Sequence, residues 1–146
     1  MSIRFVNGKP YNDGNGTTNL ELEALANKLK LPHFKYYMRD ELKNKKLLNK
    51  ECGILNLDLS KNEGTHHSCW WKNNKEKYYF DSFGIIPPKE LIKYLKANND
   101  LEYSTFQIQQ FNDSNCSEWC LYVLNELSKG NNFENIILKI IDKETY

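Results

Sequence analysis

The sequence lacks the features that would place the protein in a membrane or a secretory pathway. No apolar run approaches the ~20 residues that a helix needs to cross a bilayer. The N-terminus, MSIRFVNGKPYNDG, has no basic segment followed by an apolar one, as a signal peptide would. We therefore expect a protein with no membrane partner that is kept in a reducing compartment and not secreted. Its four cysteines are then expected to be thiols: Cys52, Cys69, Cys116 and Cys120.

An excess of charge of one sign is also lacking. There are 20 Lys and Arg residues against 19 Asp and Glu, a net charge of +1, so strong DNA binding is not expected. The chain has no internal repeat and no linker. With 146 residues and 40% hydrophobic residues it has enough apolar side chains for one core. We expect a single domain spanning residues 1–146.

Hydrophobic periodicity and breaker residues predict four helices and four strands. The helices are expected within 17–32, 86–99, 116–130 and 133–143, and the strands within 52–60, 66–71, 77–81 and 101–111. Two consecutive strands, without regular alternation of strand and helix, indicate an α+β fold. We expect a mixed or antiparallel central sheet with helices packed on it.

Two finer predictions concern which side chains are buried. The apolar alternation in CGILNLDLS, residues 52–60, is typical of a half-buried strand. In the helix within 86–99, Leu91, Ile92 and Leu95 are predicted to share one apolar face.

The segment GTHHSCWWKNNKEKYYFDSFG, residues 64–84, holds two of the three histidines in a predicted hairpin. A turn centred on Asn73-Asn74 places His66 opposite Asp81, whose carboxylate can accept the ring N–H and orient the imidazole. In that register His67 points to the opposite face. A β-bulge would exchange the two histidines, and a purely structural cross-strand His–Asp pair is the alternative interpretation.

The best-placed nucleophile is Cys116, at a transition from strand to helix. The positive end of a helix dipole lowers the pKa of a thiol at that position. Cys52, Cys69 and Cys120 are better explained as small buried hydrophobes. An oxyanion donor could come from the preceding strand, which offers Gln107, Gln109 and Gln110. Base, orienter, donor and nucleophile together suit a cysteine protease.

Five motifs of the sequence resemble those of the adenovirus-type (adenain-like, Ulp1-related) viral maturation cysteine proteases, especially those of virophages, polinton-like elements and large DNA viruses. The motifs are MRDEL, ECGILNLD, GTHHSCWW, YYFDSFG and QIQQFNDSNCSEWC. They follow one another in the family's order of His, Asp, Gln and Cys. The resemblance implies the α+β fold of that cysteine-protease family.

The resemblance also implies roles for single residues. The family's catalytic histidine falls on His66, its acidic residue on Asp81 and its nucleophile on Cys116. Its oxyanion glutamine selects Gln109, with Gln110 as the neighbouring alternative. Two positions depart from the family: His67 stands where tryptophan is usual, and Ser117 where glycine is usual. We expect His67 to be a structural or groove-lining neighbour.

The function implied by the resemblance is a cysteine endopeptidase that cleaves viral capsid precursors during virion maturation, typically at sites containing Gly or Ala. It needs no metal or organic cofactor. An activating peptide is a possible partner, and the expected location is the virion and the host-cell cytoplasm. Two alternatives are a deconjugating isopeptidase for ubiquitin- or SUMO-like proteins and a catalytically impaired relative that acts as a binding or capsid component.

A metal site is a further alternative, built from two histidines and three cysteines: His66, His67, Cys69, Cys116 and Cys120. Strand alternation sends the two histidines to opposite faces, and no cysteine pair has the spacing of a zinc knuckle. We therefore expect no metal.

Overall fold

The computed structural model describes residues 4–6, 9–11, 19–58, 66–108 and 116–144. Its elements, in chain order, are β1 (Arg4–Val6), β2 (Lys9–Tyr11), α1 (Asn19–Lys28), β3 (Phe34–Met38), the 3-10 helix η1 (Arg39–Asn44), β4 (Lys50–Asn56), β5 (His67–Asn73), β6 (Glu76–Phe80), α2 (Lys89–Tyr94), β7 (Leu101–Tyr103), α3 (Cys116–Ser128) and α4 (Phe133–Glu144). The fold is α+β, as the sequence predicts.

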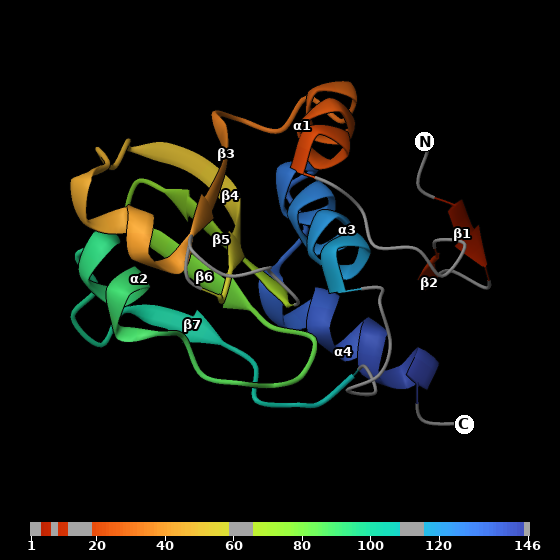
Figure 1. Ribbon diagram of the computed structural model, residues 1–146. Coiled ribbons are helices and arrows are strands. Elements are labelled where there is room, and N and C mark those ends of the chain that lie inside the picture. The colour runs from red at the N-terminus through yellow and green to blue at the C-terminus, as the bar shows by residue number, and fades with distance from the viewer. Residues whose placement is uncertain (1–3, 7–8, 12–18, 59–65, 109–115, 145–146) are drawn as a thin grey trace.

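The central sheet has five strands in the order β3-β4-β5-β6-β7. The three middle strands are antiparallel, and each edge strand runs parallel to its neighbour, so the sheet is mixed. Helices α1, α3 and α4 cover one face, whereas η1 and α2 cover the other (Figure 1). The pair β1-β2 forms a separate antiparallel sheet. None of the described helices is long and apolar enough to cross a bilayer.

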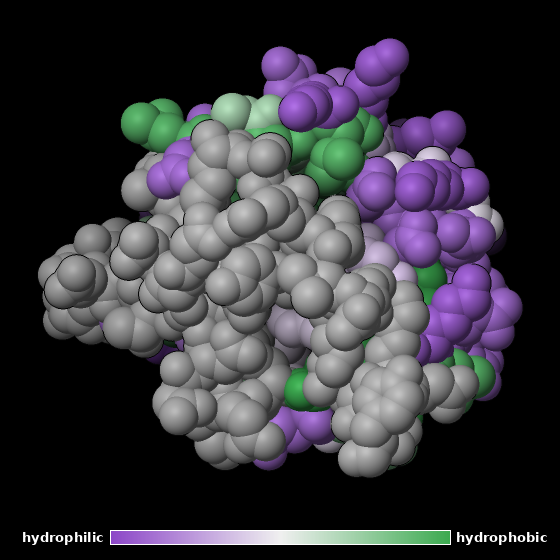
Figure 2. Space-filling model, turned by 90° about the vertical axis from the view of Figure 1, so that its right-hand side faces the viewer, coloured by the Kyte–Doolittle hydropathy of each residue, from purple (hydrophilic) through white to green (hydrophobic). Residues whose placement is uncertain are grey.

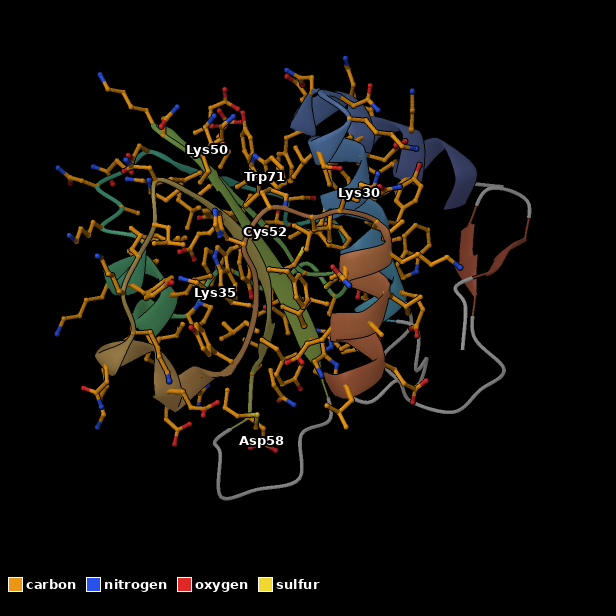
Figure 3. All side chains as sticks on the ribbon, turned by 90° about the horizontal axis from the view of Figure 1, so that it is seen from above. Lys30, Lys35, Lys50, Cys52, Asp58 and Trp71 are labelled. Atoms are coloured by element: carbon orange, nitrogen blue, oxygen red, sulfur yellow. The ribbon has the colours of Figure 1, made fainter. Side chains whose placement is uncertain are left out.

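Strand β4 is buried on both faces, and the prediction of a half-buried strand is wrong. Residues 51–56 are all buried. Cys52 and Ile54 belong to the core under α1 and α3, whereas Leu55 belongs to the core under η1 and α2. In Figure 3 the strand runs through the middle of the molecule, from Lys50 at one end toward Asp58 at the other. The strand is buried on both faces because helices cover both sides of the sheet. Alternation of apolar and polar residues indicates only a strand that has one solvent-exposed face.

The β5–β6 hairpin is present, but its register differs from the prediction by two residues. Asn73 pairs with Glu76, so the turn is Asn74-Lys75, and Asn74 adopts a positive φ of 56°. Asparagine tolerates that conformation better than most residues. A shift of two keeps every side chain on its predicted face. Continuing the observed register brings Phe83, rather than Asp81, opposite His66.

Other differences lie in the helices and at the edges of the sheet. In α2, Leu91 and the adjoining Leu95 are buried as predicted, but Tyr94 replaces Ile92, which is 37% exposed. The predicted strand within 101–111 is only β7; its residues 109–111 lie outside the described part. Strand β3 and η1 were not predicted, because β3 is half-buried throughout and shows no alternation.

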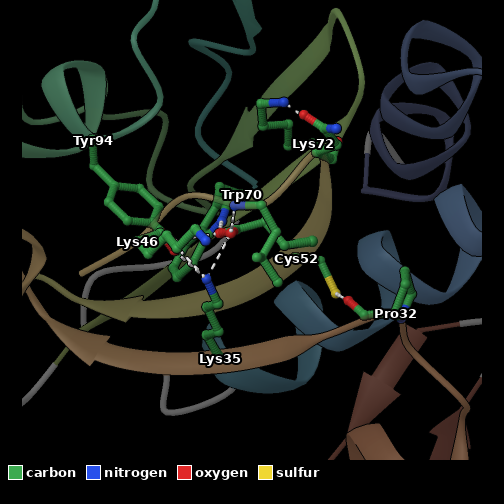
Figure 4. A network of polar contacts seen from close by, with 10 residues as sticks. Pro32, Lys35, Lys46, Cys52, Trp70, Lys72 and Tyr94 are labelled. Atoms are coloured by element: carbon green, nitrogen blue, oxygen red, sulfur yellow. Dashed lines mark hydrogen bonds and ion pairs between the residues drawn. The ribbon is translucent and has the colours of Figure 1, made fainter.

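A buried carboxylate ties the layer of η1 and α2 to the sheet (Figure 4). Glu51 is completely buried; its Oε1 accepts from Lys35 Nζ at 2.7 Å, and its Oε2 accepts from Trp70 Nε1 at 2.9 Å and from Tyr94 Oη at 2.8 Å. The Leu48 N–H donates to Oε1 as well, at 2.8 Å. These partners satisfy a charge that would otherwise be costly to bury.

Candidate active site

Helix α3 packs along β5 and thereby brings its first residue, Cys116, to the beginning of that strand. Cys120 defines the alignment: its Sγ lies 3.7 Å from the His67 carbonyl oxygen, and its own carbonyl lies 3.8 Å from Cys69 Sγ. Cys116 is one turn earlier, and its Sγ lies 3.7 Å from His67 Nδ1. The candidate nucleophile therefore sits at a helix N-terminus beside both histidines.

His66 and Asp81 form the pair that the hairpin argument predicts, in spite of the shifted register. His66 Nε2 and Asp81 Oδ1 are 2.8 Å apart, with Asp81 fully buried and the His66 side chain 12% exposed. The same carboxylate oxygen accepts the Phe83 N–H at 2.8 Å. The Phe83 ring stacks on the imidazole, with centroids 3.9 Å apart and planes within 5°. Ring and carboxylate together hold the imidazole in one orientation.

The other ring nitrogen of His66, Nδ1, is buried and has no hydrogen-bond partner among the described residues. Since Nε2 is engaged with Asp81, Nδ1 is the atom that remains to exchange a proton with Cys116. Burial by itself would lower the pKa of His66. Hydrogen bonding to Asp81, and then interaction with Cys116, outweigh it and raise that pKa to about 9.

The pKa of the Cys116 thiol moves in the opposite direction. Burial by itself would raise it, but interactions with His66 and His67 lower it to about 6. At neutral pH the arrangement therefore favours a Cys116 thiolate beside a His66 imidazolium. By contrast, burial raises the pKa values of the Cys52 and Cys120 thiols. Cys116 therefore differs from these two thiols in having a lowered pKa.

His67 lies on the face of β5 that α3 covers, which sequence reasoning did not foresee. It lies on the same face as Cys69 and Trp71, which belong to the core under α1 and α3, and Cys116 begins its helix on that face. Its Nε2 lies 2.9 Å from Tyr36 Oη, and Asn56 Nδ2 donates to the same oxygen at 3.2 Å. His67 is thus in direct contact with the candidate nucleophile.

Three neighbours of the site escaped sequence reasoning: Tyr36, Asn56 and Phe83. Tyr36 belongs to the unpredicted β3, so nothing singled it out. Phe83 belongs to the motif YYFDSFG, which carries the family resemblance. Its position two residues after Asp81 could have identified it as a neighbour of the site. The predicted oxyanion donor Gln109 and its alternative Gln110 lie outside the described residues.

The serine at the second departure from the family is buried. Ser117 is 1% exposed, and its hydroxyl donates to Glu118 Oε2 at 3.1 Å. All four cysteines are buried and free. Among the described residues, no group of three or more His, Cys, Asp and Glu side chains could hold a metal ion.

The fold places this chain beside viral cysteine proteases. The crystal structure of the ASFV pS273R protease matches it with a TM-score of 0.60 and 16% identity over 86% of this chain and 62% of that chain. The selenomethionine form of the same protease gives 0.59 and 15%, over 88% and 66%. The likeness is one of fold, and this chain spans less than two thirds of that protease's length. No protein-family model and no curated protein sequence matches the chain.

Proposed function

We propose that this protein is a cysteine endopeptidase whose active site consists of Cys116, His66 and Asp81. The observation that carries the proposal is the buried His66–Asp81 pair beside a thiol that begins a helix and has a lowered pKa. A structural His–Asp pair would account for the hydrogen bond alone. It would not account for a buried thiol whose pKa is lowered by the same imidazole.

The mechanism follows from the protonation states. Asp81 orients His66 through Nε2, so that Nδ1 takes the proton of Cys116. The thiolate attacks the carbonyl carbon of the peptide bond, and the negative charge moves onto the carbonyl oxygen. The N-terminus of α3 and the side chain of Gln109 are the proposed donors to that oxygen. His66 then protonates the leaving amine, and water hydrolyses the thioester.

The finer assignment rests on the family resemblance. The proposed substrates are viral capsid precursors, cleaved during virion maturation at sites with small residues, and the proposed location is the virion and the host-cell cytoplasm. An activating peptide is a proposed partner. The near-neutral net charge of +1 gives no support to strong DNA binding.

The test is a cleavage assay with a peptide library rich in Gly and Ala, with products identified by mass spectrometry. We expect cleavage by the wild type and by His33→Ala, a matched change of an exposed histidine, and none by Cys116→Ala or His66→Ala. Activity that survives Cys116→Ala would contradict the assignment. Hydrolysis of a ubiquitin- or SUMO-like conjugate, with no peptide cleaved, would instead select the deconjugating alternative.

A further inference from the structure

The hydrogen-bond chain behind His67 determines which of its ring nitrogens carries the proton. Asn56 is 4% exposed, and its Oδ1 accepts the Asp58 N–H at 2.9 Å, which fixes the amide with Nδ2 toward Tyr36. An amide nitrogen can only donate, so Tyr36 Oη accepts from Asn56. The tyrosine O–H is then left to donate to His67.

Tyr36 is able to donate over the whole range in which the enzyme would work, because burial raises the pKa of its hydroxyl. His67 Nε2, 2.9 Å away, is therefore the acceptor, and the proton of neutral His67 resides on Nδ1. Nδ1 is the atom that lies 3.7 Å from Cys116 Sγ, a distance suited to a hydrogen bond to sulfur.

We propose that Tyr36 and Asn56 hold His67 with a proton on Nδ1, so that His67 donates a hydrogen bond to the Cys116 thiolate. This inference rests on the proposed function, because it assigns a second stabiliser to the same thiolate. His66 exchanges the proton with Cys116, and His67 stabilises the anion that results. Tyr36 and Asn56 are positioning residues that act through His67. The assignment replaces the expectation that His67 is only a structural neighbour.

The groups that face Cys116 come from several elements. His67 is the first residue of β5 and His66 directly precedes it, Tyr36 lies on β3, and Cys120 lies one turn further along α3. Asp81 acts on Cys116 through His66. Of these, only the two histidines lower the pKa of Cys116, so changing them separately distinguishes the roles.

The experiment measures the rate of Cys116 alkylation by iodoacetamide against pH, read by mass spectrometry, and needs no substrate. We expect His67→Phe to react about tenfold more slowly than the wild type at pH 5, the loss of one charge-assisted hydrogen bond. His67→Asn should react nearly as the wild type, because its amide N–H can stand where Nδ1–H stood. His67→Gln, with its amide further out, should not.

Tyr36→Phe removes one hydroxyl and keeps the ring, so it tests the positioning role in a protein that still folds. We expect slower alkylation than in Tyr103→Phe, the matched change of an exposed tyrosine. Unchanged alkylation in both His67→Phe and Tyr36→Phe would overturn the inference. If His66→Ala alone slows the reaction, the proposed protease survives and only the role of His67 is lost; if no variant slows it, both proposals fail.

A second inference rests on a different part of the molecule, the groove between η1 and α2 on the far face of the sheet. The groove has a volume of about 780 Å³ and is lined by six lysines, Arg39 and two acidic residues. All six lysines are exposed, and none has an ion-pair partner among the described residues; Arg39 pairs with Glu90 at 3.2 Å. A protein of net charge +1 thus concentrates unpaired positive charge at one groove.

The floor of this groove is apolar and rigid. Leu42 is 2% and Tyr94 7% exposed, and the Tyr94 hydroxyl is tied to the buried Glu51 carboxylate. An aromatic ring that lies this deep offers no platform on which bases could stack, which argues against single-stranded nucleic acid. A ligand whose acidic side chains pair with the lysines, and whose apolar side chains reach the floor, would match both parts of the groove.

We infer that the groove binds an acidic, partly apolar peptide segment of another protein. The test is fluorescence anisotropy with a labelled peptide of about ten alternating Glu and Leu residues. The double variant Lys46→Glu/Lys93→Glu should bind roughly tenfold more weakly. Lys50→Glu/Lys139→Glu, the same charge change at exposed lysines outside the groove, should bind like the wild type.

Two comparisons decide the outcome. The peptide with Gln in place of Glu should bind weakly, and a single-stranded oligodeoxynucleotide of about ten bases should bind more weakly than the acidic peptide. No binding of the acidic peptide, equal loss in the two double variants, or tighter binding of the oligonucleotide would each overturn the inference.

Discussion

Replacing Asp81 with asparagine tests the electrostatic basis of the proposed active site. Asp81→Asn keeps the size of the side chain and removes its charge, so the His66 imidazolium loses its strongest partner. The pair is 2.8 Å apart and shielded, with side-chain exposures of 0% and 12%, so solvent screens it little. A hydrogen bond between charged groups contributes roughly 1.5–3 kcal/mol, and each 1.36 kcal/mol corresponds to about one pH unit.

We therefore expect the pKa of His66 to fall from about 9 in the wild type by roughly one to two pH units in Asp81→Asn. The assay is an NMR titration of the histidine Cε1–H signals. The chain has only three histidines, so single substitutions assign each one. The direction is set by the sign of the interaction, because a carboxylate stabilises the charged imidazole and its loss favours the neutral form.

The matched control is Asp100→Asn, which removes an exposed carboxylate paired with Lys77 at 2.8 Å, far from His66 in the fold. It should leave the His66 titration unchanged. If His66 titrates at the same pH in the wild type and in Asp81→Asn, the carboxylate does not hold the imidazolium, and the electrostatic reasoning is refuted.

Three further predictions follow from the same structure. Peptide cleavage should have a bell-shaped pH profile. Activity should be lost as pH falls through about 6, where Cys116 is protonated, and as pH rises through about 9, where His66 loses its proton. A kcat/KM profile with only one limb would contradict this prediction. Glu51→Gln should lower the free energy of unfolding, measured in urea, by about 3 kcal/mol, because it removes the charge that Lys35 pairs with at 2.7 Å. The same variant should leave Cys116 alkylation unchanged. A loss below about 1 kcal/mol would mean that solvent screens the pair. Gly53→Ala should also unfold at lower urea, since its added methyl carbon would lie 2.5 Å from the Lys35 carbonyl oxygen; an unchanged urea midpoint would mean that β3 moves aside.

Much of the fold could be predicted because the signals are local. Helices α3 and α4 each have an apolar stripe, and Gly130, with a positive φ of 88°, marks the end of α3. The hairpin was predicted from two strand-like runs around an Asn-Asn turn. Strand β3 was missed because both of its faces are partly covered, which leaves no alternation to detect.

The features of the candidate site likewise fall into those that local sequence signals determine and those that depend on tertiary packing. The sequence by itself determined that His66 and Asp81 share a face of the hairpin, because strand alternation is strict and a shift of two residues preserves it. It also determined that Cys116 begins a helix. Neither result depends on any contact between distant segments.

Only the tertiary structure decided which face of β5 receives α3. That packing brings Cys116 to within 3.7 Å of His67, and the parallel pairing of β3 with β4 brings Tyr36 and Asn56 behind the same ring. No local pattern encodes these contacts, because they join residues up to 49 positions apart through the packing of a helix and two strands. Local sequence preferences form each element, whereas burial of both faces of the sheet sets the elements against one another.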